Sequence, residues 1–428
     1  MRRTLLLIPH ELAGIPVFGV GWVLLLIVIA LVVRMLVAKK HGQRFTEVLA
    51  GEGFMWGVVT VAVILVLPRV ELVNAIDEPV GMAIRGYGVF LIVGVSAAVG
   101  MAAIRAKNRL IDPEVIFALA PWVLVGGIAG ARIFYLVQYR QDYDWNSLGD
   151  YLGNLFSFTR GGLVVYGSMI GAFLASLVFI YRNKLPLWRL GDAIIPCIFI
   201  GVFFGRMGCL MNGCCYGGRC EDNWLAIYFP QGSPVYGDQL TSGELLGMKA
   251  VGGNKRGTGK LASVTPNSLA DAAGITAGQV LNGIVIDEVA AEDAPRDIAA
   301  EDVVPGVTAV VNGTPFRWAP DQLPQRALPV QAAQLISSVS ALVLCLLLCG
   351  LSYFFKRAGA VMLLGFAGYA VLRFVLELVR VDEAGQFGTG LTISQWVSVV
   401  VFVLSIGTLI WLYRQPQSPS SDAKPELA

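Results

Sequence analysis

Long runs of apolar residues recur along the chain, and their lengths suit helices that cross a membrane. A helix needs about 20 mostly apolar residues to span a hydrocarbon core of roughly 30 Å. Runs that approach this length cover residues 17–37, 87–104, 115–137, 162–181, 187–206, 333–354, 359–379 and 392–413. A shorter run at 54–67 predicts one more span. The pattern therefore predicts an all-α polytopic membrane bundle of about nine transmembrane helices.

Basic residues occupy every second connection between these runs, and this alternation predicts the orientation of the chain. Short loops rich in Lys and Arg stay in the cytoplasm, and such clusters lie at 39–44, 105–109, 182–184 and 356–357. Nine spans satisfy all four clusters. We therefore expect an exterior N-terminus and a cytoplasmic tail at 415–428. The apolar stretch after Met1 is short and no small-residue cleavage site follows it, so we expect no cleaved signal peptide.

The segment 208–330 has a different character, and the orientation puts it on the exterior face. It carries Gly, Asp, Asn and Pro turn signals and short β-like runs, with no apolar run of spanning length. We predict a small β-rich extracytoplasmic head domain. The stretch 264–281 resembles the part of PDZ domains in which a strand, a short helix and a glycine turn follow one another, which suggests a PDZ-like unit at 260–318. The alternative is a family-specific β insert.

Composition supports a membrane protein and excludes several other classes. The chain is 56% hydrophobic and 14% charged, and its mean hydropathy is +0.67. A net charge of +2 is too small for a surface that follows nucleic-acid phosphates, so we expect a lipid bilayer as partner and no nucleic acid. The sequence shows neither the internal repeats of a transporter nor the HExxH motif of a metalloprotease.

Charged residues inside the apolar runs are the candidates for chemistry, because each central Arg or Asp costs roughly 2.5 to 3.5 kcal/mol to insert. These residues are Arg132, Asp192, Arg206, Arg373 and Glu377. Tyr369, Arg373 and Glu377 are spaced four residues apart, and Arg380 follows three positions later, so all four share one helix face. A buried ion pair that joins helices is one interpretation of Arg373 and Glu377. Several arginines together favour a site that grips a lipid phosphate, since guanidinium groups match phosphate oxygens bidentately.

A glycine-rich segment at 201–218 emerges at the exterior interface and carries Arg206, Asn212 and Tyr216. Glycine there lets backbone N–H groups approach an anion. Four cysteines crowd into the same region: Cys209, Cys214, Cys215 and Cys220. Their spacing is not that of standard zinc pairs and no histidine lies near, so we predict no metal and no cofactor. Disulfides on the exterior side and the packing of small residues both remain open.

The run 205–217, Gly-Arg-Met-Gly-Cys-Leu-Met-Asn-Gly-Cys-Cys-Tyr-Gly, resembles the signature of the bacterial prolipoprotein diacylglyceryl transferases. Further segments resemble the family in the same order, at 85–88, 130–132, 224–230, 329–334, 368–380 and 390–395. The resemblance covers roughly 80–415. It implies a seven-helix family core at 81–207 and 331–414, interrupted by the insert at 208–330. The segment 1–80, with two extra helices, is a departure from the family.

The resemblance implies an enzyme of the bacterial inner membrane that acts in lipoprotein biosynthesis. It would transfer diacylglyceryl from phosphatidylglycerol to the lipobox cysteine of preprolipoprotein signal peptides, release glycerol phosphate, and have its active site toward the exterior. The implied catalytic residues are Arg206, Arg373, Glu377, Tyr166 and Tyr369. The implied phosphatidylglycerol-binding residues are Arg206, Arg132, Arg85, Asn212, Gly217, Arg380 and Gln334.

Tyr166 is the second departure, because it occupies a position where the family commonly has histidine. The two histidines of the chain, His10 and His41, lie elsewhere, and a phenol with a pKa near 10 is a poor base without help. The alternative function is therefore a catalytically degenerate, lipid-binding membrane scaffold with a peptide-binding insert.

Overall fold

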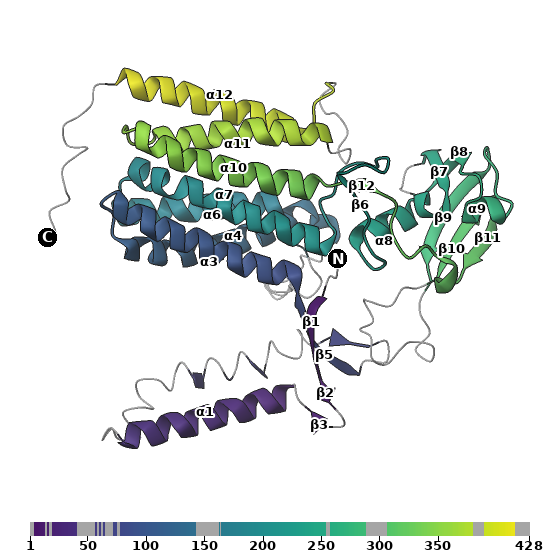
Figure 1. Ribbon diagram of the computed structural model, residues 1–428, viewed down its shortest axis with the longest axis horizontal. Coiled ribbons are helices and arrows are strands. Elements are labelled where there is room, and N and C mark those ends of the chain that lie inside the picture. The colour runs from purple at the N-terminus through teal and green to yellow at the C-terminus, as the bar shows by residue number, and fades with distance from the viewer. Residues whose placement is uncertain are drawn as a thin grey trace. The chain divides into compact units, whose positions relative to one another are not determined.

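The computed structural model describes residues 4–12, 15–16, 19–40, 56–57, 60, 63–64, 72–74, 78–142, 162, 164–253, 257–287, 306–379 and 389–415. The chain divides into two compact units. One combines residues 1–89 with 209–331, and the other combines 90–208 with 332–428. The second unit is the helical bundle in Figure 1.

Seven helices of the described chain are long and apolar enough to cross a membrane. They are α3 (Gly86–Asn108), α4 (Pro113–Gln138), α6 (Val165–Arg182), α7 (Leu187–Asn212), α10 (Ala333–Phe354), α11 (Ala360–Val379) and α12 (Ile393–Arg414). They match seven of the predicted apolar runs. Nine spans are not confirmed: helix α1 (Val20–Lys40) contains only a shorter apolar stretch, Gly21–Val37, and most of the run at 54–67 lies outside the described residues.

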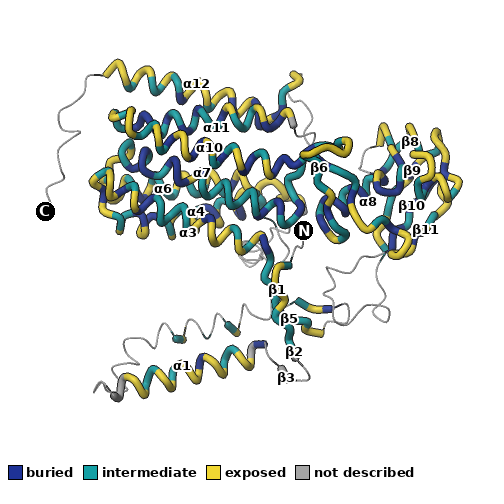
Figure 2. The backbone as a smooth tube through the Cα atoms, viewed as in Figure 1, coloured by how far each residue is buried: buried dark blue, intermediate teal, exposed yellow. Residues whose placement is uncertain are grey.

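The outer faces of these helices carry large apolar side chains that a soluble protein would bury. Ile92 is 69% exposed, Val137 66% and Leu404 63%, and Figure 2 shows exposed residues recurring along α3, α4 and α12. Lipid tails are as apolar as these side chains, so the side chains need not be buried inside the protein to avoid water. The bundle is therefore built to face hydrocarbon.

Glycines bring α4 and α6 into close contact. A Cβ atom added to Gly171 would lie 2.2 Å from the carbonyl oxygen of Gly126, and one added to Gly167 would lie 2.4 Å from that of Gly130. Both clashes are with backbone, which cannot move aside as a flexible side chain can. Small residues at such crossings let helix backbones approach each other in membranes, so these glycines have a packing role.

Asp192, one of the charges within an apolar run, lies near the start of α7 and caps another helix. Its carboxylate accepts hydrogen bonds from the backbone N–H groups of Gly359 and Met362, both at 2.8 Å, at the beginning of α11. The guanidinium of Arg109 pairs with the same carboxylate at 3.2 Å. Since the first N–H groups of a helix lack intrahelical partners and favour negative charge, Asp192 has a structural role at this end of the bundle.

The other compact unit contains a five-stranded antiparallel sheet, and it confirms the β-rich character predicted for the insert. Its strand order is β11-β10-β9-β8-β7, with β7 (Met248–Gly252), β8 (Gly259–Val264), β9 (Val280–Ile286), β10 (Val307–Val311) and β11 (Thr314–Trp318). Between β8 and β9 lie the short helix α9 (Leu269–Ala272) and the glycines 274 and 278, which have positive φ. The predicted succession of strand, helix and glycine turn is present, whereas the PDZ-like fold stays a prediction.

A pair of short strands closes the base of this insert. Strand β6 (Ala226–Ile227) pairs antiparallel with β12 (Val330–Gln331), and the N–H of Gly217 donates to the carbonyl of Gln331 at 3.0 Å. Helix α8 (Pro234–Thr241) follows β6, and its Gln239 side chain bonds both the N–H and the carbonyl of Leu328. The outgoing and returning segments of the insert therefore lie side by side.

The N-terminal segment forms a sheet that the sequence did not predict. Strand β1 (Thr4–Pro9) pairs with β5 (Pro79–Arg85), which also pairs with β4 (Leu72–Val73). Strands β2 (Glu11–Leu12) and β3 (Ile15–Pro16) form a separate pair. Gly81 has a φ of 138°, and a Cβ atom there would lie 2.1 Å from the carbonyl oxygen of Ile8. The apolar run after Met1 is thus a strand whose pairing depends on residues more than 70 positions away.

Candidate active site

An ion pair buried near the end of α11 is the first element of the candidate site. The Arg373 guanidinium lies 2.5 Å from the Glu377 carboxylate, and the two side chains are 20% and 3% exposed. Both residues belong to α11, so the pair itself does not join two helices. Any link to a second helix must therefore come from a further partner of one of the two side chains.

Glu377 is also held from α12. The hydroxyl of Thr392 donates to Glu377 Oε1 at 3.3 Å. Thr392 is the N-cap residue of α12, where its hydroxyl accepts from the N–H of Gln395 and the Gln395 side chain accepts from the N–H of Thr392. This reciprocal capping box fixes the start of the helix. The order of contacts is therefore Thr392 to Glu377 to Arg373, with the guanidinium at the partly exposed end.

Tyr369 lies one turn before Arg373 on the same face of α11. Its ring packs against Phe199 of α7, with ring centroids 5.7 Å apart. Tyr369 is partly buried, and Glu377, one turn beyond Arg373, is buried. The three described residues of the predicted polar stripe, Tyr369, Arg373 and Glu377, thus face the interior of the bundle, whereas the fourth, Arg380, lies outside the described residues.

Arg206 is a partly buried cation near the end of α7. Within the part of the chain that the structure describes, it has no hydrogen bond or ion pair. One turn earlier, the carbonyl of Phe203 accepts from the hydroxyl of Ser338 at 3.0 Å. That bond joins α7 to the start of α10, where Gln334 is fully buried. Arg206 therefore differs from Arg373, because no described carboxylate neutralises it.

Arg132 is almost completely buried, at 1% exposure. Its Nη1 donates to the carbonyl of Gly162 at 3.2 Å, and its guanidinium lies 5.4 Å from the centre of the Tyr135 ring. The N–H of Val164 also bonds the carbonyl of Ala131 at 3.3 Å. These contacts tie Arg132 and its helix to the segment that leads into α6.

Tyr166 follows directly in the first turn of α6 and is 46% exposed. Its hydroxyl has no partner among the described residues. The phenol that occupies the place of the expected histidine is therefore accessible from outside the protein.

The remaining predicted residues lie in other parts of the structure. Arg85 ends β5, and Asn212 ends α7. Gly217 is buried beside the β6–β12 pair. These three belong to the unit that contains the insert, whereas Arg380 lies outside the described residues.

Contacts between helix ends show that the bundle residues of the site share one end. This end is defined by the contacts of Val164 with Ala131, Ser338 with Phe203 and Thr392 with Glu377. Asp192 and its partners define the opposite end. The predicted site residues toward the first end are Arg132, Tyr166, Arg206, Gln334, Arg373 and Glu377, while Tyr369 lies midway along α11. The sequence missed Thr392, although Thr-Ile-Ser-Gln at 392–395 has the spacing of a capping box.

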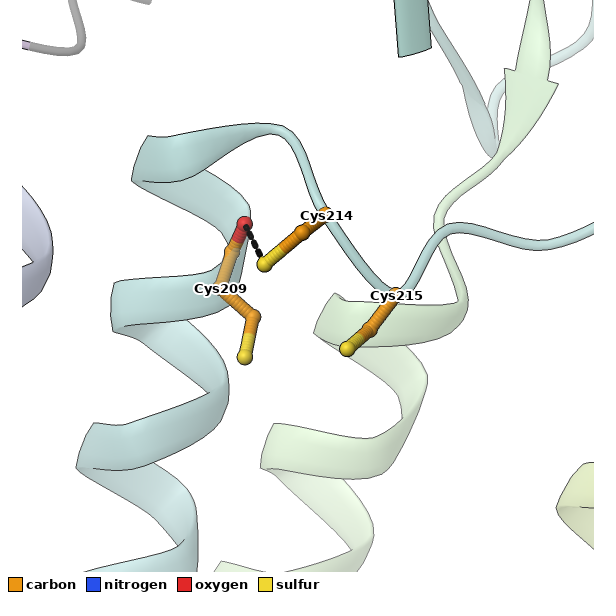
Figure 3. A group of neighbouring side chains, drawn as sticks. All are labelled: Cys209, Cys214 and Cys215. Carbon is orange, nitrogen blue, oxygen red and sulfur yellow. Dashed lines mark hydrogen bonds between the residues drawn. The ribbon is translucent and has the colours of Figure 1, made fainter. Parts of the chain in front are cut away.

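All seven cysteines of the chain are described and are free thiols. The disulfides that the sequence left open are therefore not formed in this structure. Cys209, Cys214 and Cys215 nevertheless lie together at the end of α7, as Figure 3 shows.

Comparison with known proteins gives a consistent result. The family model for prolipoprotein diacylglyceryl transferase matches residues 75–411. A phosphatidylglycerol–prolipoprotein diacylglyceryl transferase of Rhodopirellula baltica is 44% identical over 451 residues, which cover 98% of this chain and 91% of the relative. Enzymes of the same name from Trichormus variabilis and Listeria welshimeri are 28% and 31% identical. In both cases the alignment spans 35% of this chain and about half of the relative, 51% and 53%.

Proposed function

The chain belongs to the prolipoprotein diacylglyceryl transferase family, and we propose that it transfers diacylglyceryl from phosphatidylglycerol to the lipobox cysteine of preprolipoproteins. It is a transferase and a multi-pass membrane protein. The same proposal gives it a place in the bacterial inner membrane, with the site end of the bundle toward the exterior. Basic residues near the opposite end, such as Arg105, Lys107, Arg182 and Arg357, support that orientation.

The reaction exchanges a carbon–oxygen bond for a carbon–sulfur bond. The cysteine sulfur attacks the glycerol carbon that bears the phosphate ester, and the electrons of the broken bond leave with glycerol phosphate. The thiol proton must also be removed, because the thiolate is the nucleophile and a free thiol has a pKa near 8.5. As the carbon–oxygen bond breaks, its electron pair passes to the phosphate oxygen, so negative charge grows on the phosphate. Donors fixed near that charge would lower the barrier.

The charge pattern of the bundle carries this proposal. Glu377 neutralises Arg373, while Arg206 has no described anionic partner. An uncompensated cation within a span is expensive and by default indicates a functional site. The phosphate of phosphatidylglycerol carries one negative charge, so it would neutralise Arg206 on binding. Arg373, preoriented by Glu377, would donate to the same phosphate as its charge increases in the transition state.

The tyrosines and the buried arginine receive supporting roles. Tyr166 is exposed at the site end, and we assign its hydroxyl to the incoming thiol, as a hydrogen-bond partner or proton relay. Tyr369 would donate to the lipid headgroup from the face of α11 that carries Arg373. Arg132 acts through the carbonyl of Gly162, and we assign it to the position of the segment before Tyr166. Gln334, Asn212, Gly217, Arg85 and Arg380 remain proposed headgroup-binding residues.

A second candidate function is that of a lipid-binding scaffold without transfer activity. The observation that favours it is Tyr166 in place of histidine. One assay separates the two functions: purified protein is given phosphatidylglycerol labelled in the diacylglyceryl glycerol, together with a lipobox peptide. We expect label on the peptide cysteine with the wild type and its loss with Arg206→Ala and with Arg373→Ala. A folded wild type that binds the lipid but transfers no label would identify the scaffold instead.

A further inference from the structure

The end of α7 is built so that two cysteine side chains meet. The N–H of Cys214 bonds the carbonyl of Cys209 at 3.1 Å, and the N–H of Gly213 bonds that of Leu210 at 3.3 Å, with φ of 75° at Gly213. This pattern is a Schellman motif, in which the residue after the left-handed glycine packs against the residue five positions earlier. That contact is usually made by two apolar side chains. Here it is made by Cys214 and Cys209.

Cys215 completes the group through an uncommon backbone conformation. Its φ is 58°, a left-handed value that side chains other than Gly, Asn and Asp seldom adopt. Figure 3 shows the three sulfur atoms at the turn between α7 and the following loop. All three lie within 4.8 Å of one another. Such local strain persists when the surrounding structure requires it, and it often accompanies functional sites.

We propose that Cys209, Cys214 and Cys215 form a binding site for one soft metal ion, Zn²⁺ or Cu⁺. Zinc–sulfur bonds of about 2.3 Å in tetrahedral geometry place sulfur atoms about 3.8 Å apart. Sulfur atoms within 4.8 Å of one another reach that spacing by small side-chain rotations. Thiolates select soft ions over Mg²⁺ and Ca²⁺. With Zn²⁺ the fourth position would be taken by water, whereas Cu⁺ would be held by the three sulfurs alone.

The chemistry of loading is a simple exchange. The three thiols lose three protons and the metal ion takes their place, so no oxidant is needed. All three cysteines are only partly buried, which leaves a route for the ion. The Cys214 thiol donates to the carbonyl of Cys209 at 3.8 Å, and the metal ion would replace the proton of this bond. Metal binding would also fix the turn that carries Asn212. The sequence argued against a metal because the spacing lacks a CxxC pair, but the Schellman motif brings positions 209 and 214 together without one.

Metal binding can be tested on the full-length protein without any transfer assay. Reduced, metal-free protein in detergent is titrated with Zn²⁺ and, separately, with Cu⁺, while bound metal and released protons are measured. Co²⁺ serves as a spectroscopic probe, because thiolate ligands give sulfur-to-cobalt charge-transfer bands. We expect one ion per chain, about three protons released per Zn²⁺, and protection of the three thiols from alkylation.

The matched variants are Cys214→Ser with Cys215→Ser and, as control, Cys220→Ser. Cys220 is a nearby cysteine outside the cluster. We expect the double variant to bind the ion at least 100-fold more weakly and the control to bind it normally, with equal helix content. Unchanged metal binding in the double variant would refute the site. Substoichiometric binding of both ions by reduced wild type would do the same, as would a stable disulfide among the three cysteines in freshly purified protein.

Discussion

Thr392 offers a sharp test of how the candidate site is held together. Thr392→Val keeps the shape of the side chain but removes the hydroxyl that caps α12 and donates to Glu377. Loss of an N-cap costs about 1 kcal/mol, and loss of a hydrogen bond to a charged group about 1.5 to 3 kcal/mol. The second loss acts directly on the orientation of Glu377 and hence of Arg373.

If roughly half of the second loss, about 0.75 to 1.5 kcal/mol, appears in the transition state, kcat/KM should fall about four- to tenfold, since about 1.4 kcal/mol corresponds to a factor of 10. The drop should lie mainly in kcat, because the interaction orients a group that acts as charge develops. Thr392→Ser keeps the hydroxyl and should restore activity to within about threefold. Transfer of labelled diacylglyceryl to a lipobox peptide measures both variants.

Ser398→Ala is the matched control, because the Ser398 hydroxyl is buried in α12 and bonds only the carbonyl of Ser394 among the described residues. It removes a hydroxyl from the same helix without touching Glu377, so activity should stay near the wild-type value. Thermal unfolding of each variant reports the cost to stability. Equal activity of Thr392→Val and Ser398→Ala, at equal stability, would refute the chain of contacts from Thr392 to Arg373.

Arg373→Lys should lower kcat/KM at least tenfold, because an ammonium cannot reproduce a bidentate fork; comparison with Arg373→Ala in the transfer assay checks this. Tyr166→Phe should lower transfer about tenfold but leave lipid binding unchanged, and a normal rate would remove the phenol from the mechanism. Gly171→Ala should destabilise the bundle by more than about 2 kcal/mol through overpacking. The control Gly100→Ala should leave the melting temperature unchanged, because a Cβ atom added at Gly100 would enter open space. Replacing 248–318 by a short linker should reduce transfer to whole preprolipoproteins more than to a lipobox peptide, and equal effects on both would exclude a client-binding role.

The spacing of residues along the sequence predicted the features that arise within a single helix. Apolar runs gave the seven core helices, and the spacing of Tyr369, Arg373 and Glu377 gave a polar face with an ion pair on it. The contact of Thr392 with Glu377 joins two helices across residues that the pattern treats as a loop, so periodicity did not reveal it. Strand β1 escaped prediction for a similar reason, since its partner lies more than 70 residues away.

Two residues show how burial changes an interpretation. Arg132 matches the family in sequence and its role in lipid binding stays a prediction, while the structure adds contacts of its guanidinium with Gly162 and Tyr135. Asp192 was grouped with the other charges inside the spans, yet it caps α11 at the opposite end of the bundle. A charge within an apolar run indicates that a polar partner exists. The sequence alone does not tell whether that partner is a substrate or a helix terminus.

The short β6–β12 pair at the base of the insert has an evolutionary consequence. Because Ala226–Ile227 and Val330–Gln331 run antiparallel, the chain between them forms a closed cassette whose two ends are already joined. Extending such a loop costs only about 0.6 kcal/mol for each doubling of its length. Natural selection can therefore enlarge, replace or remove the cassette in a lineage while the seven spans keep their packing.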